Sequence, residues 1–430
     1  MAIGEDNEMR FSIRQILHSK VVQNSMWLFI LQIANTVLPL LTIPYVTRIL
    51  GAAGYGEYTI AYNLITYCQV VVEYGFVMSG ARRIAISSDD KENINSVFSR
   101  IITARAVLFI ISLTGVLIVT LIRGMSPSQI MNILALMIVV FSVIFQMNWL
   151  YQGMQQMRFI TIVNVIGRLI SVGLIFAFIH QSNQVFLYCI FYSFTFIISS
   201  LVGLVIAKRK YRLHYSFPGL KGIISELKDG WHLFTSVAVS RLFGSIGVTI
   251  LGIYAAVEAV GGYSAVYKVP YIMTLCFSPI GQALYPYMSK SIVTNREAAI
   301  KKQKRIFVPI MGVFIIMGIA VIVLRDFVVK LLLGSEYLPY SNLIIFMIPQ
   351  MLFGILNNFL GVQSLVASGH QKQYSRAILI SVAVLLVANL IMCPTLGIYG
   401  TTLATLISEV TLSLLLVYFC KKNYWIVGEQ

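Results

Sequence analysis

Six ionisable side chains lie inside long apolar stretches of this sequence: Glu73, Arg105, Arg168, Arg241, Lys268 and Glu409. A charge is costly in such a stretch. If the stretch spans a membrane, its ionisable residues usually face a bundle interior or an aqueous cavity. Four of the six are cationic and two are anionic. Guanidinium and ammonium groups in a cavity suit an anionic substrate such as a phosphate or diphosphate. The sequence therefore predicts a central cationic cavity.

The position of each group in its stretch indicates its role. Arg241 lies about ten residues from either end, too deep to reach the interface. Glu409 is central and could be the counter-ion of Arg241 or a proton carrier, and both readings stay open. Arg168 could form a structural ion pair with Glu73, and Lys268 could extend to the outer interface. Arg105 lies one turn into its stretch, so we expect it to snorkel to the cytoplasmic surface.

Other kinds of site are not predicted. The five cysteines and five histidines are dispersed, without the spacing of metal ligands, so we expect no metal site. The glycine-rich segment 51–56 lacks the Lys-Ser/Thr of a nucleotide loop, so it is interpreted as an external turn. We expect no cofactor.

Composition places the chain in a membrane. Of its 430 residues, 58% are hydrophobic and 11% are charged, whereas a soluble domain carries about 25% charged residues. Apolar runs of about 20 residues are long enough to be helices that cross a bilayer. We therefore predict an all-α polytopic membrane protein of about twelve spans: 21–46, 58–80, 101–122, 130–151, 159–179, 184–207, 231–255, 262–288, 306–324, 341–367, 376–393 and 397–420.

The distribution of Lys and Arg sets the predicted orientation. Of the 32 such residues, 24 fall in segments assigned to the cytoplasm and four in segments assigned to the outside, as the positive-inside rule requires. This places both termini in the cytoplasm. It also explains the net charge of +16 without nucleic acid, because anionic lipid of the inner leaflet attracts these residues.

The chain divides into two six-helix lobes, 1–207 and 231–430, around a cytoplasmic connector, 208–230. Two segments, Gly56–Tyr62 and Gly261–Tyr267, share the pattern Gly-x-Tyr-Ser/Thr-x-x-Tyr, and each occupies the second span of its lobe. Their equivalent positions indicate two parallel repeats. In the connector, apolar residues spaced as on one face of a helix predict an amphipathic helix at the interface: Leu220, Ile223, Ile224 and Leu227.

Several blocks resemble a known family. The segment 39–51, PLLTIPYVTRILG, followed by Gly54-Tyr55-Gly56, resembles the first-helix signature of polysaccharide repeat-unit flippases. These are the O-antigen and capsule translocases of the Wzx type, in the superfamily of multidrug and polysaccharide exporters. Further blocks are similar to the family's later ones: Glu73-Tyr74-Gly75-Phe76, Arg82-Arg83, the Arg241 region, Leu251-Gly252 and Tyr263–Lys268.

The resemblance implies a carrier of undecaprenyl-diphosphate-linked oligosaccharide in the bacterial inner membrane, working by alternating access and coupled to an ion gradient. By analogy, Arg241, Lys268 and Arg168 contact the diphosphate or acidic sugars. Arg48 matches the family motif and either joins that site or fixes a turn. Glu73 and Glu409 are candidates for ion coupling. Partners would include the polysaccharide polymerase and the chain-length regulator.

Two alternatives remain. A multidrug exporter on the same fold would need an acidic cavity for organic cations, whereas this one sums to positive. A membrane polymerase or glycosyltransferase commonly uses a long external loop, whereas the longest one predicted here, 325–340, has about sixteen residues. We therefore expect a transporter and no enzyme.

Overall fold

The structure is a computed structural model that describes residues 20–87 and 90–425. The predicted cytoplasmic termini, residues 1–19 and 426–430, lie outside the described residues. All regular elements of the described part are helical: α2 (Lys20–Glu73), α3 (Phe76–Ile86), α4 (Lys91–Ile122), α5 (Pro127–Phe145), α6 (Asn148–Gly153), α7 (Met157–Phe178), α8 (Val185–Tyr211), α9 (Gly219–Phe243), α10 (Ile246–Tyr254), α11 (Val257–Val266), α12 (Lys268–Thr294), α13 (Arg296–Val323), α14 (Arg325–Leu332), η1 (Ser335–Leu343), α15 (Ile344–Asn357), η2 (Asn358–Val366), α16 (Gln371–Cys420) and η3 (Lys421–Trp425).

Eight helical stretches of the described chain are long and apolar enough to cross a membrane. Two of them each cover two predicted spans. In these two, the backbone leaves the helical conformation between the spans, at Gly51 in α2 and at Gly397 in α16. The eight stretches therefore account for ten of the twelve predicted spans. The other two correspond to α9 with α10 and to α11 with α12. Large apolar side chains such as Ile110, Leu121 and Ile316 remain exposed on these helices, as lipid-facing residues do.

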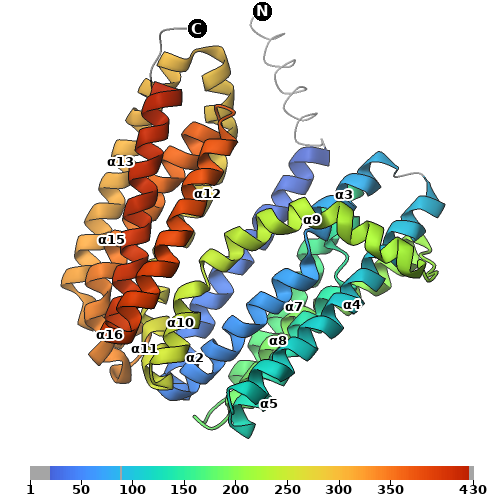
Figure 1. The fold of residues 1–430 in the computed structure, drawn as a ribbon, viewed down its shortest axis with the longest axis horizontal. Helices are drawn as coiled ribbons and strands as arrows, with labels where there is room; N and C mark the ends of the chain where they lie inside the picture. The colour runs from blue at the N-terminus through green and yellow to red at the C-terminus, as the bar shows by residue number, and fades with distance from the viewer. Residues whose placement is uncertain (1–19, 88–89, 426–430) are drawn as a thin grey trace, which may run out of the picture. The chain divides into compact units, whose positions relative to one another are not determined.

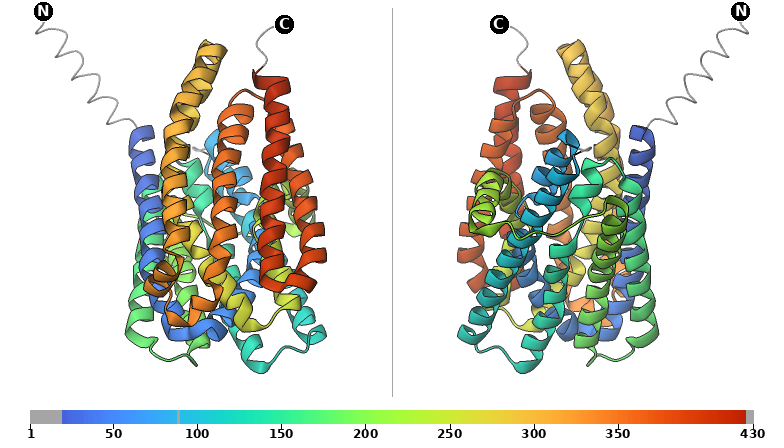
Figure 2. Two further views of the ribbon diagram at one scale, coloured as in Figure 1. Left: turned by 90° about the vertical axis from the view of Figure 1, so that its left-hand side faces the viewer. Right: turned by 90° about the vertical axis from the view of Figure 1, so that its right-hand side faces the viewer.

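The chain forms two compact units. Unit one contains the residues up to Thr42 and Ala61–Leu242, and unit two contains Ile43–Ile60 and the residues from Phe243 onward. In unit one, α8 packs against both α5 and α7 (Figure 1). In unit two, α15 packs against α13 and α16, and α12 packs against α13 and α15 (Figure 2). The predicted division into 1–207, 208–230 and 231–430 stays a prediction.

Several predicted spans are interrupted. The second one, 58–80, breaks where Tyr74 and Gly75 adopt positive φ values of 46° and 75°. The eighth, 262–288, breaks at Tyr267 between α11 and α12. Between residues 325 and 340 the predicted external loop is helical, as α14 and the start of η1. A right-handed helix requires negative φ, so the helix ends where Tyr74 and Gly75 adopt positive values.

The connector and the predicted seventh span share one helix. Helix α9 begins at Gly219 and continues without a break to Phe243. Ile223 and Glu226 of this helix are buried, whereas Leu220 is exposed. The Glu226 carboxylate accepts a hydrogen bond of 2.7 Å from Nη1 of Arg83 on α3, so an ion pair fastens the connector part of α9 within unit one.

The two Gly-x-Tyr segments meet inside unit two. A Cβ atom added to Gly56 would lie 2.1 Å from the carbonyl oxygen of Val257, and one added to Gly261 would lie 1.9 Å from that of Ala52. Real Cβ atoms do not approach so closely. The glycines of the repeated pattern therefore allow backbone to lie against backbone where these segments cross.

Arg105 is buried rather than extended to the surface, so the prediction that it snorkels is wrong. Its side chain has 0% exposure, and its guanidinium lies 5.9 Å from the Phe76 ring centroid. Nη1 donates hydrogen bonds of 2.9 and 2.8 Å to the carbonyl oxygens of Val143 and Gln146, at the end of α5. The last carbonyls of a helix lack intrahelical partners. Arg105 supplies their donor, and its positive charge suits that end of the helix.

Replacing Arg105 with methionine is expected to lower the free energy of unfolding by about 2 kcal/mol, because two buried carbonyl oxygens lose their donor. Thermal denaturation of the purified protein in detergent measures the change. Arg209→Met is the matched control, because Arg209 is exposed on α8. Equal stability of the two variants would contradict this role of Arg105.

Candidate functional site

Glu73 and Arg241 form an ion pair in unit one. Glu73 is the last residue of α2, and its carboxylate lies 3.2 Å from Nη2 of Arg241 near the end of α9. Beside the pair, the rings of Tyr74 and Phe234 stack with centroids 4.5 Å apart. The Arg241 side chain is 49% exposed and that of Glu73 is 17% exposed. Since a guanidinium has five N–H donors, Arg241 keeps donors free for a further anion.

Arg168 does not pair with Glu73, so the prediction of that ion pair is wrong. Nη1 of Arg168 instead donates a 2.8 Å hydrogen bond to Oδ1 of Asn35 on α2. The amide carries no charge, so this hydrogen bond gives the half-buried guanidinium on α7 no anionic partner. Of the residues predicted to bind substrate, unit one thus holds Arg168 and Arg241. Between these two, only Arg241 forms an ion pair with a described carboxylate.

Lys268 is the first residue of α12 in unit two and follows the break at Tyr267. Its ammonium lies 5.5 Å from the ring centroid of Tyr271. Successive rings of Tyr263, Tyr267 and Tyr271 stack with centroids 6.4 Å apart. Among the residues that the structure describes, Lys268 has neither an ion pair nor a hydrogen bond. A half-buried cation beside aromatic faces is poised for an anionic ligand.

Glu409 belongs to a hydrogen-bonded chain in unit two. Nδ2 of Asn357, at the end of α15, donates a 2.7 Å hydrogen bond to the Glu409 carboxylate and a 3.1 Å bond to its backbone carbonyl. Ser413, one turn further along α16, donates a 2.6 Å bond to Oδ1 of Asn357. These bonds fix the rotamer of a half-buried carboxylate. Asn357 was not among the predicted site residues, although it is a polar residue in an apolar stretch.

Arg48 fastens two segments of unit two. Its guanidinium donates to the carbonyl oxygen of Leu331 at the end of α14. Beside it, the Tyr337 hydroxyl donates a 3.1 Å bond to the carbonyl of Thr47. The carboxylate of Glu336 accepts a 2.8 Å bond from the amide of Ala52, just after the break at Gly51. The Leu331 contact is consistent with the turn-fixing alternative for Arg48; that role and its contact with substrate both stay predictions.

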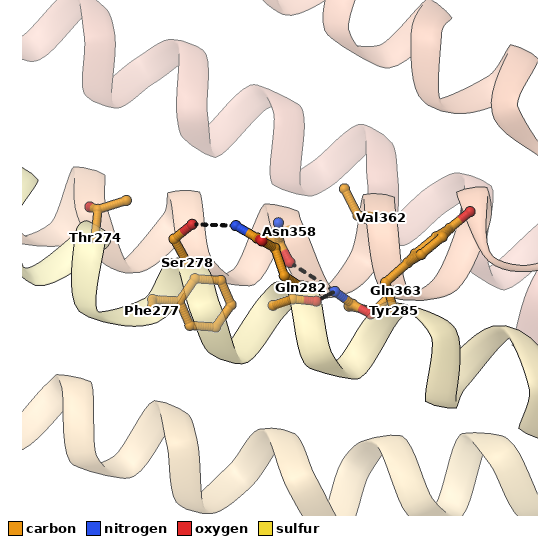
Figure 3. Close-up of a pocket in the computed structure, with 9 residues that line it drawn as sticks. Thr274, Phe277, Ser278, Gln282, Tyr285, Asn358, Val362 and Gln363 are labelled. Atoms are coloured by element: carbon orange, nitrogen blue, oxygen red, sulfur yellow. Dashed lines mark hydrogen bonds between the residues drawn. The ribbon is translucent and has the colours of Figure 1, made fainter. Parts of the chain in front are cut away.

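A pocket of about 460 Å³ opens between α12 and η2 of unit two (Figure 3). Its lining carries amide, hydroxyl and aromatic groups and no charged side chain: Thr274, Phe277, Ser278, Gly281, Gln282, Tyr285, Asn358, Val362 and Gln363. None of these residues was predicted. The available signal was the spacing of Thr274, Ser278 and Gln282, which repeats every four residues along one helix face.

Two relatives of this chain are named for the transport of glycans. It is 26% identical over 412 residues to an O-antigen transporter of Escherichia coli (strain K12), covering 94% of this chain and 98% of that one. The low-salt glycan biosynthesis flippase Agl15 of Haloferax volcanii is 23% identical over 90% of this chain and 81% of its own length.

Among solved structures, the fold matches that of the lipid II flippase MurJ in an inward closed conformation. The TM-score is 0.71 at 15% identity, over 93% of this chain and 87% of that one. This likeness establishes a two-lobe polytopic membrane fold. The model of the family described as polysaccharide biosynthesis protein matches residues 21–292. The chain therefore belongs to the polysaccharide biosynthesis protein family, whose model covers more than half of it.

Proposed function

We propose that this protein is a flippase for oligosaccharide repeat units linked to undecaprenyl diphosphate, of O-antigen, capsule or another exopolysaccharide. It would move them from the cytoplasmic to the periplasmic leaflet of the bacterial inner membrane by alternating access. The observation that carries the proposal is the similarity over 94% of the chain to an O-antigen transporter. The cations of the described helices support it, because a diphosphate is the part that all such substrates share.

Three of the predicted cations, Lys268, Arg168 and Arg241, have environments that suit a phosphate. Among the described residues Lys268 has no anionic partner, Arg168 donates a hydrogen bond to a neutral amide and has no ion pair, and Arg241 is half exposed beside Glu73. Charge-assisted hydrogen bonds from such groups to phosphate oxygens are strong. We infer that Arg241, Lys268 and Arg168 contact the diphosphate or acidic sugars, while Arg48 acts at the turn near Gly51.

Two alternatives have less support. A drug exporter for organic cations needs acidic groups. Of the two predicted carboxylates, Glu73 is paired with Arg241. A polymerase or glycosyltransferase fits less well, because the relatives are named as transporters and a flippase. The polymerase and the chain-length regulator are proposed as partners, and both termini as cytoplasmic.

Depletion of the protein in its host tests the proposed function. We expect complete repeat units to accumulate on undecaprenyl diphosphate while surface polysaccharide disappears, with mass spectrometry of extracted lipids as the measurement. The accumulated glycan would also identify the sugars. Normal surface polysaccharide without accumulated intermediate, together with increased retention of cationic dyes, would instead favour the exporter.

Glu409→Gln is expected to abolish the dependence of transport on an ion gradient. Glutamine keeps an oxygen that accepts the hydrogen bond from Asn357 but cannot ionise. Transport into proteoliposomes, measured with and without an imposed proton or sodium gradient, detects the change. Ser413→Ala serves as control, since it removes the hydrogen bond from Ser413 to Asn357 and leaves the Glu409 carboxylate in place. A gradient effect that persists in Glu409→Gln would exclude Glu409 as the coupling group.

A further inference from the structure

The pocket between α12 and η2 has chemistry unlike that of the predicted cationic residues. It lies wholly in unit two and has a volume of about 460 Å³, within the usual range for small-molecule sites. Amide side chains both donate and accept hydrogen bonds, and hydroxyls do the same. Most of the lining surface is apolar, with Phe277, Tyr285 and Val362 among its residues, and the polar groups are interspersed. An uncharged lining of this mixed kind suits a sugar, which has hydroxyls and an apolar ring face.

One face of α12 carries the polar groups of this pocket. Thr274, Ser278, Gln282 and Tyr285 follow one another at intervals of three or four residues, and Figure 3 shows the last three on the side that faces Asn358 and Gln363. Gln282 and Tyr285 are exposed. Polar groups that face hydrocarbon without partners carry a large energetic cost. Thr274 and Gln282 donate hydrogen bonds within α12, to the carbonyl oxygen of Pro270 and to Oγ of Ser278. Among the described residues, the amide oxygen of Gln282 and the hydroxyl of Tyr285 have no partner, so these are the groups that this face offers to water or a polar ligand.

The opposite wall is a π-helix with a buried, incompletely bonded amide. Gln363 is 1% exposed, and its Nε2 donates to the carbonyl of Gly281 at 2.8 Å and to Oδ1 of Asn358 at 3.3 Å. Its Oε1 accepts no hydrogen bond from any residue that the structure describes. Asn358 and Gln363 are five residues apart, the spacing that a π-helix brings onto one side, and such turns are frequent at functional sites. The acceptor left at Oε1 calls for a donor such as a hydroxyl.

We propose that this pocket is a glycan subsite, which binds uncharged sugar hydroxyls of the lipid-linked substrate through Gln282, Asn358 and Gln363. The proposal rests on the flippase function proposed above. Lys268 starts the same helix, and Gln282 follows it by about four turns, so both lie on one face. Gln282 lies about 21 Å from Lys268 along the axis at the rise of an α-helix. A diphosphate held at Lys268 would thus extend its sugars toward the amides.

Two ligands separate the glycan from the headgroup in a binding test. The first is the lipid-linked oligosaccharide extracted from cells depleted of this protein, and the second is undecaprenyl diphosphate without sugars. Native mass spectrometry or microscale thermophoresis of the purified, detergent-solubilised protein gives both Kd values. We expect wild type to bind the glycosylated lipid more tightly than the bare one.

Gln282→Leu and Tyr285→Phe are the test variants, because both side chains are exposed in the pocket and neither contributes a hydrogen bond between helices. Gln282→Leu should raise the Kd for the glycosylated lipid about tenfold, the loss expected for one or two hydrogen bonds, and leave the Kd for the bare lipid unchanged. Tyr285→Phe should act in the same direction with a smaller effect. Gln371→Leu, an exposed amide at the start of α16, should change neither value.

The outcomes distinguish the two proposals. If wild type binds neither lipid, the flippase function fails, and the glycan subsite fails with it. If both variants still bind the glycosylated lipid more tightly than the bare lipid, as wild type does, the glycan subsite is wrong and the flippase function stands. Equal weakening of both lipids by Gln282→Leu would also overturn the subsite, since that pattern means a general change in the protein.

Discussion

Replacing Arg241 with alanine is expected to lower the transfer of lipid-linked oligosaccharide between leaflets about 10- to 100-fold. A hydrogen bond to a charged group contributes about 1.5–3 kcal/mol, and each 1.4 kcal/mol corresponds to a factor of ten. Arg241 retains exposed donors beside Glu73, so its loss would remove the proposed contact to the diphosphate. Rescue of surface polysaccharide in depleted cells, corrected for the amount of folded variant in the membrane, measures the effect.

A charge exchange tests whether Arg241 acts only through its ion pair. Combining Glu73→Arg with Arg241→Glu preserves an opposite-charge pair where the two side chains lie 3.2 Å apart. We expect this double variant, compared at equal amounts of folded protein, to transport as poorly as Arg241→Ala. Recovery of transport in the exchanged pair would show that the pair is purely structural and would contradict a substrate contact by Arg241.

Gly261→Ala is expected to lower the free energy of unfolding by about 3 kcal/mol, a large value for an overpacked site. The added Cβ would lie 1.9 Å from the carbonyl oxygen of Ala52, which is backbone and cannot move aside as a side chain does. Gly56→Ala, with its Cβ 2.1 Å from the carbonyl of Val257, should behave alike. Size-exclusion chromatography after heating in detergent gives the melting temperature of each variant.

Gly312→Ala provides the matched control for these two variants. Gly312 lies within α13 of the same unit, and no atom lies within 4 Å of its added Cβ. Alanine favours a helix over glycine by about 1 kcal/mol, so this variant should be as stable as wild type or more so. If Gly261→Ala and Gly312→Ala have the same melting temperature, the close crossing of the repeated segments is not required for the fold.

The sequence predicted the membrane fold well because hydrophobic length alone identifies spans. Interruptions were harder to predict, since the break at Tyr74–Gly75 depends on backbone angles that Gly75 permits but does not require. Such a break changes the site, because it makes Glu73 the end of a helix rather than the interior of one. The prediction that Gly56 and Gly261 begin equivalent segments gave no sign that these glycines would lie at one crossing.

Partners of charged residues were the least predictable part of the site. Span position identified Glu73, Arg168 and Arg241 as ionisable residues inside spans, but pairing depends on which helix faces meet, and one sequence does not give those faces. Glu73 therefore received the wrong partner. Arg105 was assigned by depth alone, whereas the carbonyl groups at the end of α5 decide its position. Neutral polar residues such as Gln282 were not predicted, because an amide in a span is far less unusual than a charge.

The most direct test of the central claim is a leaflet-exposure assay in proteoliposomes that contain the purified protein and its lipid-linked oligosaccharide. A membrane-impermeant glycosidase, added outside, removes only glycans in the outer leaflet. Vesicles without protein should retain about half of the glycan. We predict that wild-type protein makes nearly all of it accessible and that Arg241→Ala slows this exposure. If the wild-type protein, folded and inserted with its ion gradient supplied, leaves the inner half protected, the protein is not a flippase for this lipid.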